Sequence, residues 1–181
     1  VPGTNIIAQE RAFTAWCIQQ GRGVNVYDYT NGGGGTRTIR SLEDIPTGHF
    51  AALTVYLSSS TPVTSDLLTK LSTGPHVAGL YFTSVQNFEP GSLPTLSRFP
   101  KLEVLGLSNS SFGDADAAVL RSFGELRYLM LTNSRVTDAC LDVVAGLPML
   151  EILDLTNLPI TDAGLARLTR APSLRRLYLN S

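Results

Sequence analysis

The chain has 181 residues, of which 43% are hydrophobic, and this is enough material for one domain with a substantial core. Its 14 Lys and Arg residues nearly balance its 15 Asp and Glu residues, which leaves a formal net charge of -1. A chain so close to neutral has no overall field that would attract nucleic acid or an anionic membrane, and it contains no apolar run of the roughly 18 residues that a membrane span needs.

The first predicted element is an amphipathic helix over residues 6–20. Apolar side chains recur there at helical spacing, with Phe13 and Trp16 as the anchors that would hold the helix against a core. Glu10 and Arg11 stand where a signal peptide would be apolar. The chain also begins with valine instead of methionine, so we expect it to be a piece of a longer protein.

A small hairpin is predicted next. Residues 24–29 alternate like a strand, the segment Asn31-Gly-Gly-Gly-Gly35 predicts a flexible turn, and residues 36–40 can return as the partner strand. Residues 1–49 do not fit the repeat that follows, and a stack of repeats needs an atypical end to cover its first hydrophobic face. We therefore expect residues 1–49 to form an N-terminal cap, helix plus hairpin, in one continuous domain with the rest.

Residues 50–181 carry a repeat of 24 to 25 residues. The pattern L-x-x-L-x-L begins at Leu102, Leu126, Leu150 and Leu174. Counting weaker copies, the predicted strands have the inward-facing pairs Val55/Leu57, Leu80/Phe82, Leu105/Leu107, Leu129/Leu131, Leu153/Leu155 and Leu177/Leu179. This period and pattern predict a leucine-rich repeat solenoid of five full turns and a sixth strand, in which the leucines stack inside.

A short helix is predicted after each of the first five strands. Apolar residues at offsets 0, 5 and 8 mark its inner face over residues 63–71, 88–96, 112–120, 136–144 and 160–168. Thr137 and Thr161 suit the N-cap position, and an aspartate in the first turn would meet the positive helix end. Because Pro90 and Pro94 interrupt the second copy, we expect it to be 3₁₀ or irregular.

The motif T-D-A-x-L marks the expected helix starts at Thr137 and Thr161, and L-x-x-L-x-L strands adjoin it. This combination resembles the cysteine-containing subclass of leucine-rich repeats, as found in bacterial, planctomycete-type proteins. There an A-E-R-x-x-x-x-W-like helix precedes the first repeat, and Ala8 through Trp16 is similar. The resemblance implies a right-handed α/β solenoid with a parallel sheet on its concave side and short helices on its convex side. It also implies an interaction region that accompanies a kinase or another effector module.

One position departs from that family. An asparagine or cysteine is usual three residues after the last strand leucine, and this chain has Ser110, Ser134 and Leu158 there. A serine hydroxyl can still bond the backbone of the turn, whereas Leu158 cannot. A continuous ladder of polar side chains is therefore in doubt.

Residues between the strand leucines should form an open face, because successive side chains of a strand point to opposite sides. Four of the six tyrosines fall there, and tyrosine, methionine and arginine are enriched at protein interfaces. The candidate protein-binding residues are Tyr56, Tyr81, Tyr128, Met130, Asp154, Arg176 and Tyr178. Tyrosine also suits exposed strand positions for its own sake, so an unused face or a convex-side site stays open.

Other residue patterns have simpler structural explanations. Asp114, Asp138 and Asp162 recur at 24-residue steps, but helix-start electrostatics explains them and no second carboxylate column would complete a metal site. The glycine-rich turn lacks the order of a phosphate-binding loop, and His49 and His76 belong to no zinc or nucleophile motif. Cys17 and Cys140 are too few for a disulfide framework or a metal cluster and are expected to be small buried side chains.

The sequence thus favours a non-catalytic module that recognises a protein or peptide through its concave sheet face, without catalytic residue, cofactor, metal, nucleic acid or membrane. The alternative is a structural spacer or self-association segment, including a homo-dimer, that stacks through the uncapped C-terminal strand over residues 174–179. Hydrolase or transferase chemistry would need a constellation of side chains that the sequence does not contain. Free cysteines slightly favour a cytoplasmic location.

Overall fold

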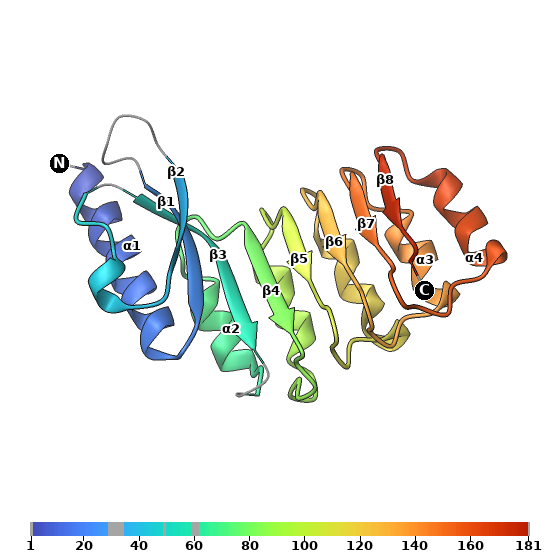
Figure 1. Ribbon diagram of the computed structural model, residues 1–181, viewed down its shortest axis with the longest axis horizontal. Helices are drawn as coiled ribbons and strands as arrows, with labels where there is room; N and C mark the ends of the chain where they lie inside the picture. The colour runs from blue at the N-terminus through green and yellow to red at the C-terminus, as the bar shows by residue number, and fades with distance from the viewer. Residues whose placement is uncertain (1, 29–34, 49, 59–61, 181) are drawn as a thin grey trace.

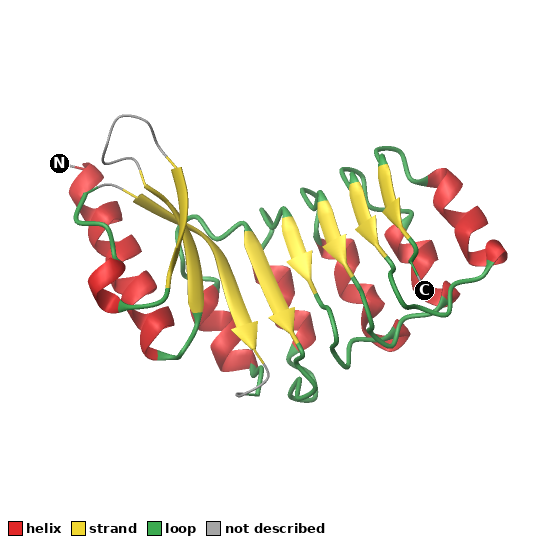
Figure 2. Ribbon diagram, viewed as in Figure 1, coloured by secondary structure: helices red, strands yellow, loops and turns green. Residues whose placement is uncertain are grey.

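The structure is a computed structural model that describes residues 2–28, 35–48, 50–58 and 62–180. One sheet of strands forms the front layer in Figures 1 and 2, and the helices pack behind it. The strands follow the order β2-β1-β3-β4-β5-β6-β7-β8. Their bounds are β1 Gly23–Asp28, β2 Gly35–Ile39, β3 Phe50–Ser58, β4 Gly79–Thr83, β5 Val104–Gly106, β6 Tyr128–Met130, β7 Ile152–Asp154 and β8 Arg176–Tyr178.

The second layer contains both α-helices and 3₁₀-helices, the latter labelled η. The α-helices are α1 Pro2–Gln19, α2 Ser65–Leu71, α3 Asp138–Val144 and α4 Asp162–Arg167. The 3₁₀-helices are η1 Leu42–Asp44, η2 Leu93–Arg98, η3 Asp114–Ser122 and η4 Leu168–Arg170. Because β3 to β8 are parallel and each helix connects one strand to the next, every repeat is one turn of the solenoid.

The inward-facing side chains of the strands form one core along the stack. Leu80, Leu105, Leu129 and Leu153 are in register across four neighbouring strands, and all are fully buried. Each leucine therefore lies between those of the repeats before and after it. This confirms the predicted fold class, an α/β leucine-rich repeat solenoid with a parallel sheet on its concave side, short helices on its convex side and a helix-hairpin cap at its N-terminus.

The predicted cap elements are present at the N-terminal end of the sheet. β1 pairs antiparallel with both β2 and β3, so the hairpin extends the repeat sheet. Helix α1 packs behind it, with Phe13 buried and Trp16 partly buried as the expected anchors. Ile6 is a correction, because it is 41% exposed although its spacing had placed it on the inner face. The predicted turn over residues 31–34 and His49 lie outside the described residues.

The caps of the helices explain where they begin. The side-chain oxygens of Thr137 and Thr161 accept hydrogen bonds from backbone N–H groups of their own helices, as expected for N-caps. The segment with the two prolines contains the 3₁₀-helix η2, as predicted. The next copy was expected to be a short helix, and it is the 3₁₀-helix η3. Its N-cap, Gly113, has no side chain to bond the first turn, and Asp116 accepts from the Gly113 N–H at 2.9 Å in its place.

Candidate interaction surface

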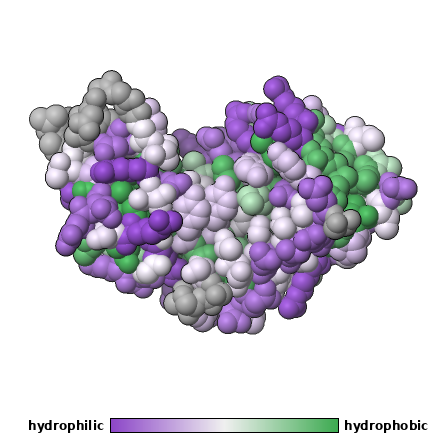
Figure 3. Space-filling view, in the orientation of Figure 1, coloured by the Kyte–Doolittle hydropathy of each residue, from purple (hydrophilic) through white to green (hydrophobic). Residues whose placement is uncertain are grey.

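The side of the sheet away from the helices is called the open sheet face, and the strand register arranges its residues in rows. One row consists of Tyr56, Tyr81, Gly106, Met130, Asp154 and Tyr178. The row beside it consists of Thr54, Gly79, Val104, Tyr128, Ile152 and Arg176. All seven sequence-predicted candidate residues therefore lie in two adjacent rows of one surface. The space-filling view looks onto this side of the molecule (Figure 3).

Two tyrosines and a glycine form the most ordered part of the open sheet face. The rings of Tyr56 and Tyr81 are stacked, with centroids 5.0 Å apart and planes 13° from parallel. The Tyr81 ring covers Gly106, where a Cβ atom would lie 2.5 Å from a ring carbon. A glycine is therefore required at this position for Tyr81 to lie flat on the sheet. The stack presents a rigid aromatic surface before any partner arrives.

Tyr81 and Tyr128 of this face stay neutral around physiological pH. Burial raises the pKa of Tyr81 above its usual value of 10, and the neighbouring Tyr56 and Tyr128 raise it further. Burial also raises the pKa of Tyr128, with smaller contributions from Asp154 and Tyr178. Each hydroxyl therefore keeps its proton and can donate a hydrogen bond. Asp154 in turn accepts the N–H of Thr156 at 2.9 Å, which orients its carboxylate on the surface.

The cap contributes polar side chains to the same face. Asn25 on β1 donates its side-chain amide to the Tyr56 hydroxyl oxygen at 2.7 Å. Thr38 on β2 donates its hydroxyl to the side-chain carbonyl oxygen of Asn25, also at 2.7 Å. A hollow of about 360 Å³ adjoins these groups and is lined by Gly21, Gly23, Thr38, Arg40, Tyr56, Leu57, Ser58 and Thr83. The sequence analysis did not identify this hollow, because it forms only where β2 and β3 come together around β1.

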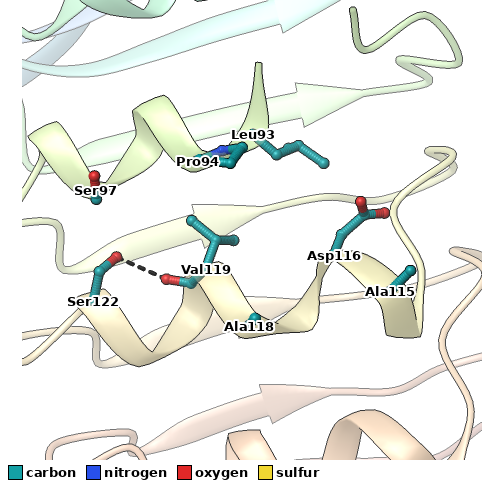
Figure 4. A pocket seen from close by; sticks show the side chains of 8 residues that line it. All are labelled: Leu93, Pro94, Ser97, Ala115, Asp116, Ala118, Val119 and Ser122. Carbon is teal, nitrogen blue, oxygen red and sulfur yellow. Dashed lines mark hydrogen bonds between the residues drawn. The ribbon is translucent and has the colours of Figure 1, made fainter. Parts of the chain in front are cut away.

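The convex side carries a separate groove. It lies between η2 and η3, encloses about 420 Å³ and is lined by Leu93, Pro94, Ser97, Ala115, Asp116, Ala118, Val119 and Ser122. Figure 4 shows Val119 between the two 3₁₀-helices and the Ser122 hydroxyl bonded to the Val119 carbonyl oxygen at 2.7 Å. The acidic side chain that lines this groove, Asp116, already accepts a hydrogen bond from the N–H of Gly113, the N-cap of η3. This groove is where a binding site would lie if the protein used its convex side instead of the open sheet face.

The aspartate column joins neighbouring repeats. The two carboxylate oxygens of Asp114 accept the backbone N–H of Thr137 at 2.9 Å and its hydroxyl at 2.6 Å. Asp138 accepts the same two groups of Thr161 at 2.9 and 2.5 Å, and these bonds lower the pKa of the Asp138 carboxyl. Asp114 and Asp138 thus each bond the N-cap threonine of the following repeat. Helix-start electrostatics alone had not predicted this role.

No metal centre or activated thiol is found in the described ranges. They contain no group of three or more His, Cys, Asp or Glu side chains placed to hold a metal ion. Cys17 and Cys140 are fully buried, and burial raises the pKa of each thiol to about 12. Both remain protonated thiols near neutral pH, which suits the small buried side chains that were expected.

His76 has a partner that the sequence analysis did not foresee. Its Nδ1 atom contacts the Glu10 carboxylate from α1, and a Glu10 oxygen also accepts the backbone N–H of Ala52 on β3 at 3.1 Å. Glu10 is fully buried, whereas His76 lies on the surface. This explains the glutamate of the N-terminal helix as a polar link between the cap and the first repeat.

Asparagines that sequence reasoning missed hold the turns after β5, β6 and β7. Asn109, Asn133 and Asn157 have φ angles of 53°, 52° and 56°, in the left-handed region that asparagine tolerates. The Asn133 side-chain amide donates to the side-chain carbonyl oxygen of Asn109 at 2.9 Å. Their 24-residue spacing is a signal in the sequence, but the expectation of a polar ladder concerned only the next position, which holds Ser110, Ser134 and Leu158.

The serine substitutions at that next position behave differently from each other. Ser110 donates its hydroxyl to the Leu107 carbonyl oxygen at 2.6 Å, as predicted. The buried Ser134 hydroxyl has no hydrogen-bond partner among the residues that the structure describes, so the same expectation was wrong there. The doubt about a continuous polar ladder at this position was therefore justified.

None of the helices in the described part of the chain is both long enough and apolar enough to cross a membrane.

Comparison with known proteins found similar chains among solved structures. No family model and no curated protein matches the sequence. Among solved structures, an internalin, InlF, from Listeria monocytogenes is similar with a TM-score of 0.48 and 23% identity, over 61% of this chain and 30% of the internalin chain. The leucine-rich repeat ectodomain of the receptor kinase SOBIR1 from Arabidopsis thaliana gives a TM-score of 0.47 and 14% identity, over 96% of this chain and 92% of the ectodomain.

Proposed function

We propose that this leucine-rich repeat solenoid is a non-catalytic interaction module that recognises a protein or peptide through the open sheet face. The observation that carries the proposal is the alignment of Tyr81, Tyr128, Met130 and Tyr178 in two adjacent rows, with Tyr81 held flat by Tyr56. A surface whose aromatic side chains are already ordered loses little conformational entropy on binding. The full contact set comprises Tyr56, Tyr81, Tyr128, Met130, Asp154, Arg176 and Tyr178.

The proposal includes the setting of the module. Residues 1–49 serve as the cap of residues 50–181 in one continuous domain, because the hairpin and the repeats share one sheet. The T-D-A-x-L helix starts support the cysteine-containing subclass of bacterial repeats, and Cys140 lies within α3 in one of them. In this setting the module is part of a larger protein and brings a partner to it.

The test compares tyrosines of the open sheet face with a residue of the convex groove. Peptides are selected from a displayed random library with the wild-type protein, and their affinities are measured by calorimetry. Tyr128→Ala and Tyr178→Ala should each weaken binding by more than about 1 kcal/mol, because aromatic side chains dominate such contacts. Val119→Thr, which alters the convex groove, is the matched control and should leave affinity unchanged. Loss of binding in the Val119 variant alone would contradict the proposal and favour the convex groove.

A second candidate function, self-association through the C-terminal end, rests on a separate observation. Leu177 and Leu179 are 36% and 41% exposed, although the same pattern positions in earlier repeats are buried, and Tyr178 between them is 42% exposed. Figure 3 shows the resulting hydrophobic area at the C-terminal end of the molecule. β8 is also an edge strand of the sheet, so its free backbone groups can pair with a second copy.

The homo-dimer is tested by light scattering over a range of protein concentrations. The double variant Leu177→Asp/Leu179→Asp should abolish a concentration-dependent increase in mass. Leu42→Asp is the control, since Leu42 is 48% exposed at the other end of the molecule and should not affect association. A wild-type protein that stays monomeric at about 100 μM, a concentration where even weak dimers with micromolar Kd would assemble, would contradict this second function.

A further inference from the structure

The hollow at the cap end of the open sheet face has lining groups of one chemical kind. Arg40, Thr38, Tyr56, Ser58 and Thr83 line it with a guanidinium and four hydroxyls. No aspartate or glutamate is among its lining residues. A site that offers hydrogen-bond donors and a positive charge, without a competing carboxylate, suits an anionic group.

The hydrogen bonds around the hollow have a direction that frees a donor. Thr38 donates its hydroxyl to the Asn25 carbonyl oxygen, and the Asn25 amide donates to the Tyr56 hydroxyl oxygen, each at 2.7 Å. The Tyr56 oxygen is therefore used as an acceptor, while its own O–H proton is left to donate. Two side chains of the cap thereby orient a tyrosine of the first repeat so that it offers a proton at the hollow.

Arg40 differs from the other arginine of its hairpin. Arg37 forms an ion pair with Asp28, at 3.3 Å between Nη2 and Oδ2. Arg40 has no ion-pair or side-chain hydrogen-bond partner within residues 2–28, 35–48, 50–58 and 62–180, and it is exposed. An arginine that no internal carboxylate neutralises can give its full bidentate donor set to a ligand.

We propose that this hollow binds the side-chain carboxylate of an acidic residue in a peptide that lies along the open sheet face. The inference rests on the proposed function and specifies its partner, which carries Asp or Glu at the end of the peptide that reaches the cap. Arg40 pairs with the carboxylate, and the Tyr56 hydroxyl donates to it. The neighbouring peptide residues then lie on the stacked ring of Tyr81 and continue toward Met130.

The charges of the rest of the face agree with this orientation. Asp154 and Arg176 occupy neighbouring rows on β7 and β8, at the opposite end of the repeats from Arg40. At the cap end, Arg40 supplies a positive charge to a hollow whose lining contains no carboxylate. An acidic residue bound at the hollow would meet attraction there and no like charge from the lining residues.

The first experiment uses a minimal probe. N-acetylglutamate methylamide and the matched neutral compound N-acetylglutamine methylamide are titrated into isotope-labelled protein, and amide shifts are followed by NMR. The acidic probe should shift the amides of Gly21, Gly23 and Thr83, whereas the neutral probe should not. Arg40→Gln should abolish these shifts, and the matched variant Arg37→Gln, three residues earlier on β2, should retain them. Equal shifts with both probes, or shifts unchanged in Arg40→Gln, would overturn the inference.

A second experiment separates failure of this inference from failure of the proposed function. Peptides selected on the wild-type protein should share an acidic residue, and Arg40→Gln should weaken their binding about tenfold or more, as expected for a charged hydrogen bond. If the peptides depend on Tyr128 and Tyr178 but share no acidic residue and ignore Arg40→Gln, the inference fails and the function stands. If no selected peptide depends on the tyrosines while the acidic probe still shifts the hollow, the proposed function fails and the carboxylate site stands.

Discussion

The two ends of the repeat stack carry the same kind of strand but differ in what covers it. At the N-terminal end, Val55 and Leu57 of β3 are 0% and 1% exposed, because the next layer of the molecule is the cap. At the C-terminal end, the equivalent Leu177 and Leu179 are 36% and 41% exposed. Burial of a repeat leucine therefore depends on its neighbours on both sides, as expected for a quasi-one-dimensional stack.

The cap achieves its cover by combining apolar and polar contacts. Phe13 packs so tightly against the first repeat that a Cβ on Gly74 would lie 2.6 Å from its ring. Arg11 donates to the Pro46 carbonyl oxygen at 2.5 Å, and buried Glu10 accepts the N–H of Ala52. Helix α1 is thus held at defined points, whereas the final strand offers the same backbone and leucine pattern to no described neighbour.

The largest expected effect comes from truncating the same pattern position at the middle and at the end of the stack. Leu153→Ala should lower the free energy of unfolding by about 2–5 kcal/mol, because Leu153 is fully buried and its loss leaves a cavity. Leu177→Ala, the matched variant in the next repeat, should cost less than about 1 kcal/mol because its side chain is partly exposed already. Chemical denaturation of both variants measures the difference. Equal losses would mean that the C-terminal strand is covered in solution.

A smaller effect is expected from removing the polar link of the cap. Glu10→Ala should lower the free energy of unfolding by about 1–3 kcal/mol, because the buried N–H of Ala52 loses its acceptor. Glu10→Gln keeps an acceptor oxygen and should cost less. Hydrogen exchange at the Ala52 amide gives a local measurement, and it should accelerate in Glu10→Ala. Unchanged protection in both variants would show that the cap does not depend on this contact.

The smallest effect is expected from the aspartates between repeats. Asp138→Asn should lower the melting temperature, because the carboxylate that bonds Thr161 is lost, whereas Asp162→Asn, at the last position of the column, should leave it unchanged. The folded-state pKa of Asp138 is lowered, so its contribution is present above the unfolded pKa of about 4 and is lost as the pH falls through the lower folded value. The difference in melting temperature between wild type and Asp138→Asn should therefore vanish in acid. A difference that persists in acid strong enough to protonate Asp138 in both the folded and the unfolded state would exclude this linkage.

Much of the repeat architecture follows from spacing alone. A strand has a side-chain period of two, so each L-x-L element predicts which residues face the core and which face the opposite side. The register places Tyr81, Met130 and Asp154 in one row, as the 24-to-25-residue period requires. Thr137 and Thr161 cap their helices because the capping preference is local to a few residues.

Contacts between distant segments could not be predicted in this way. Packing brings together the groups that determine three of these features. They are the 3₁₀ conformation of η3, the burial of Glu10 beside His76, and the bonds from Asp114 and Asp138 to the next repeat. The hollow with Arg40 has the same origin, since its lining comes from β2, β3, β4 and the turn before β1.

The sequence by itself determined the repeat, its parallel strands and the residues that share the open sheet face, because these depend on local periodicity. Only the tertiary structure decided which leucines are covered, which aspartates have partners and that Arg40 has no ion-pair partner in the described part of the chain. These outcomes depend on the neighbours of a residue in space, and a periodic pattern repeats the residue without specifying those neighbours.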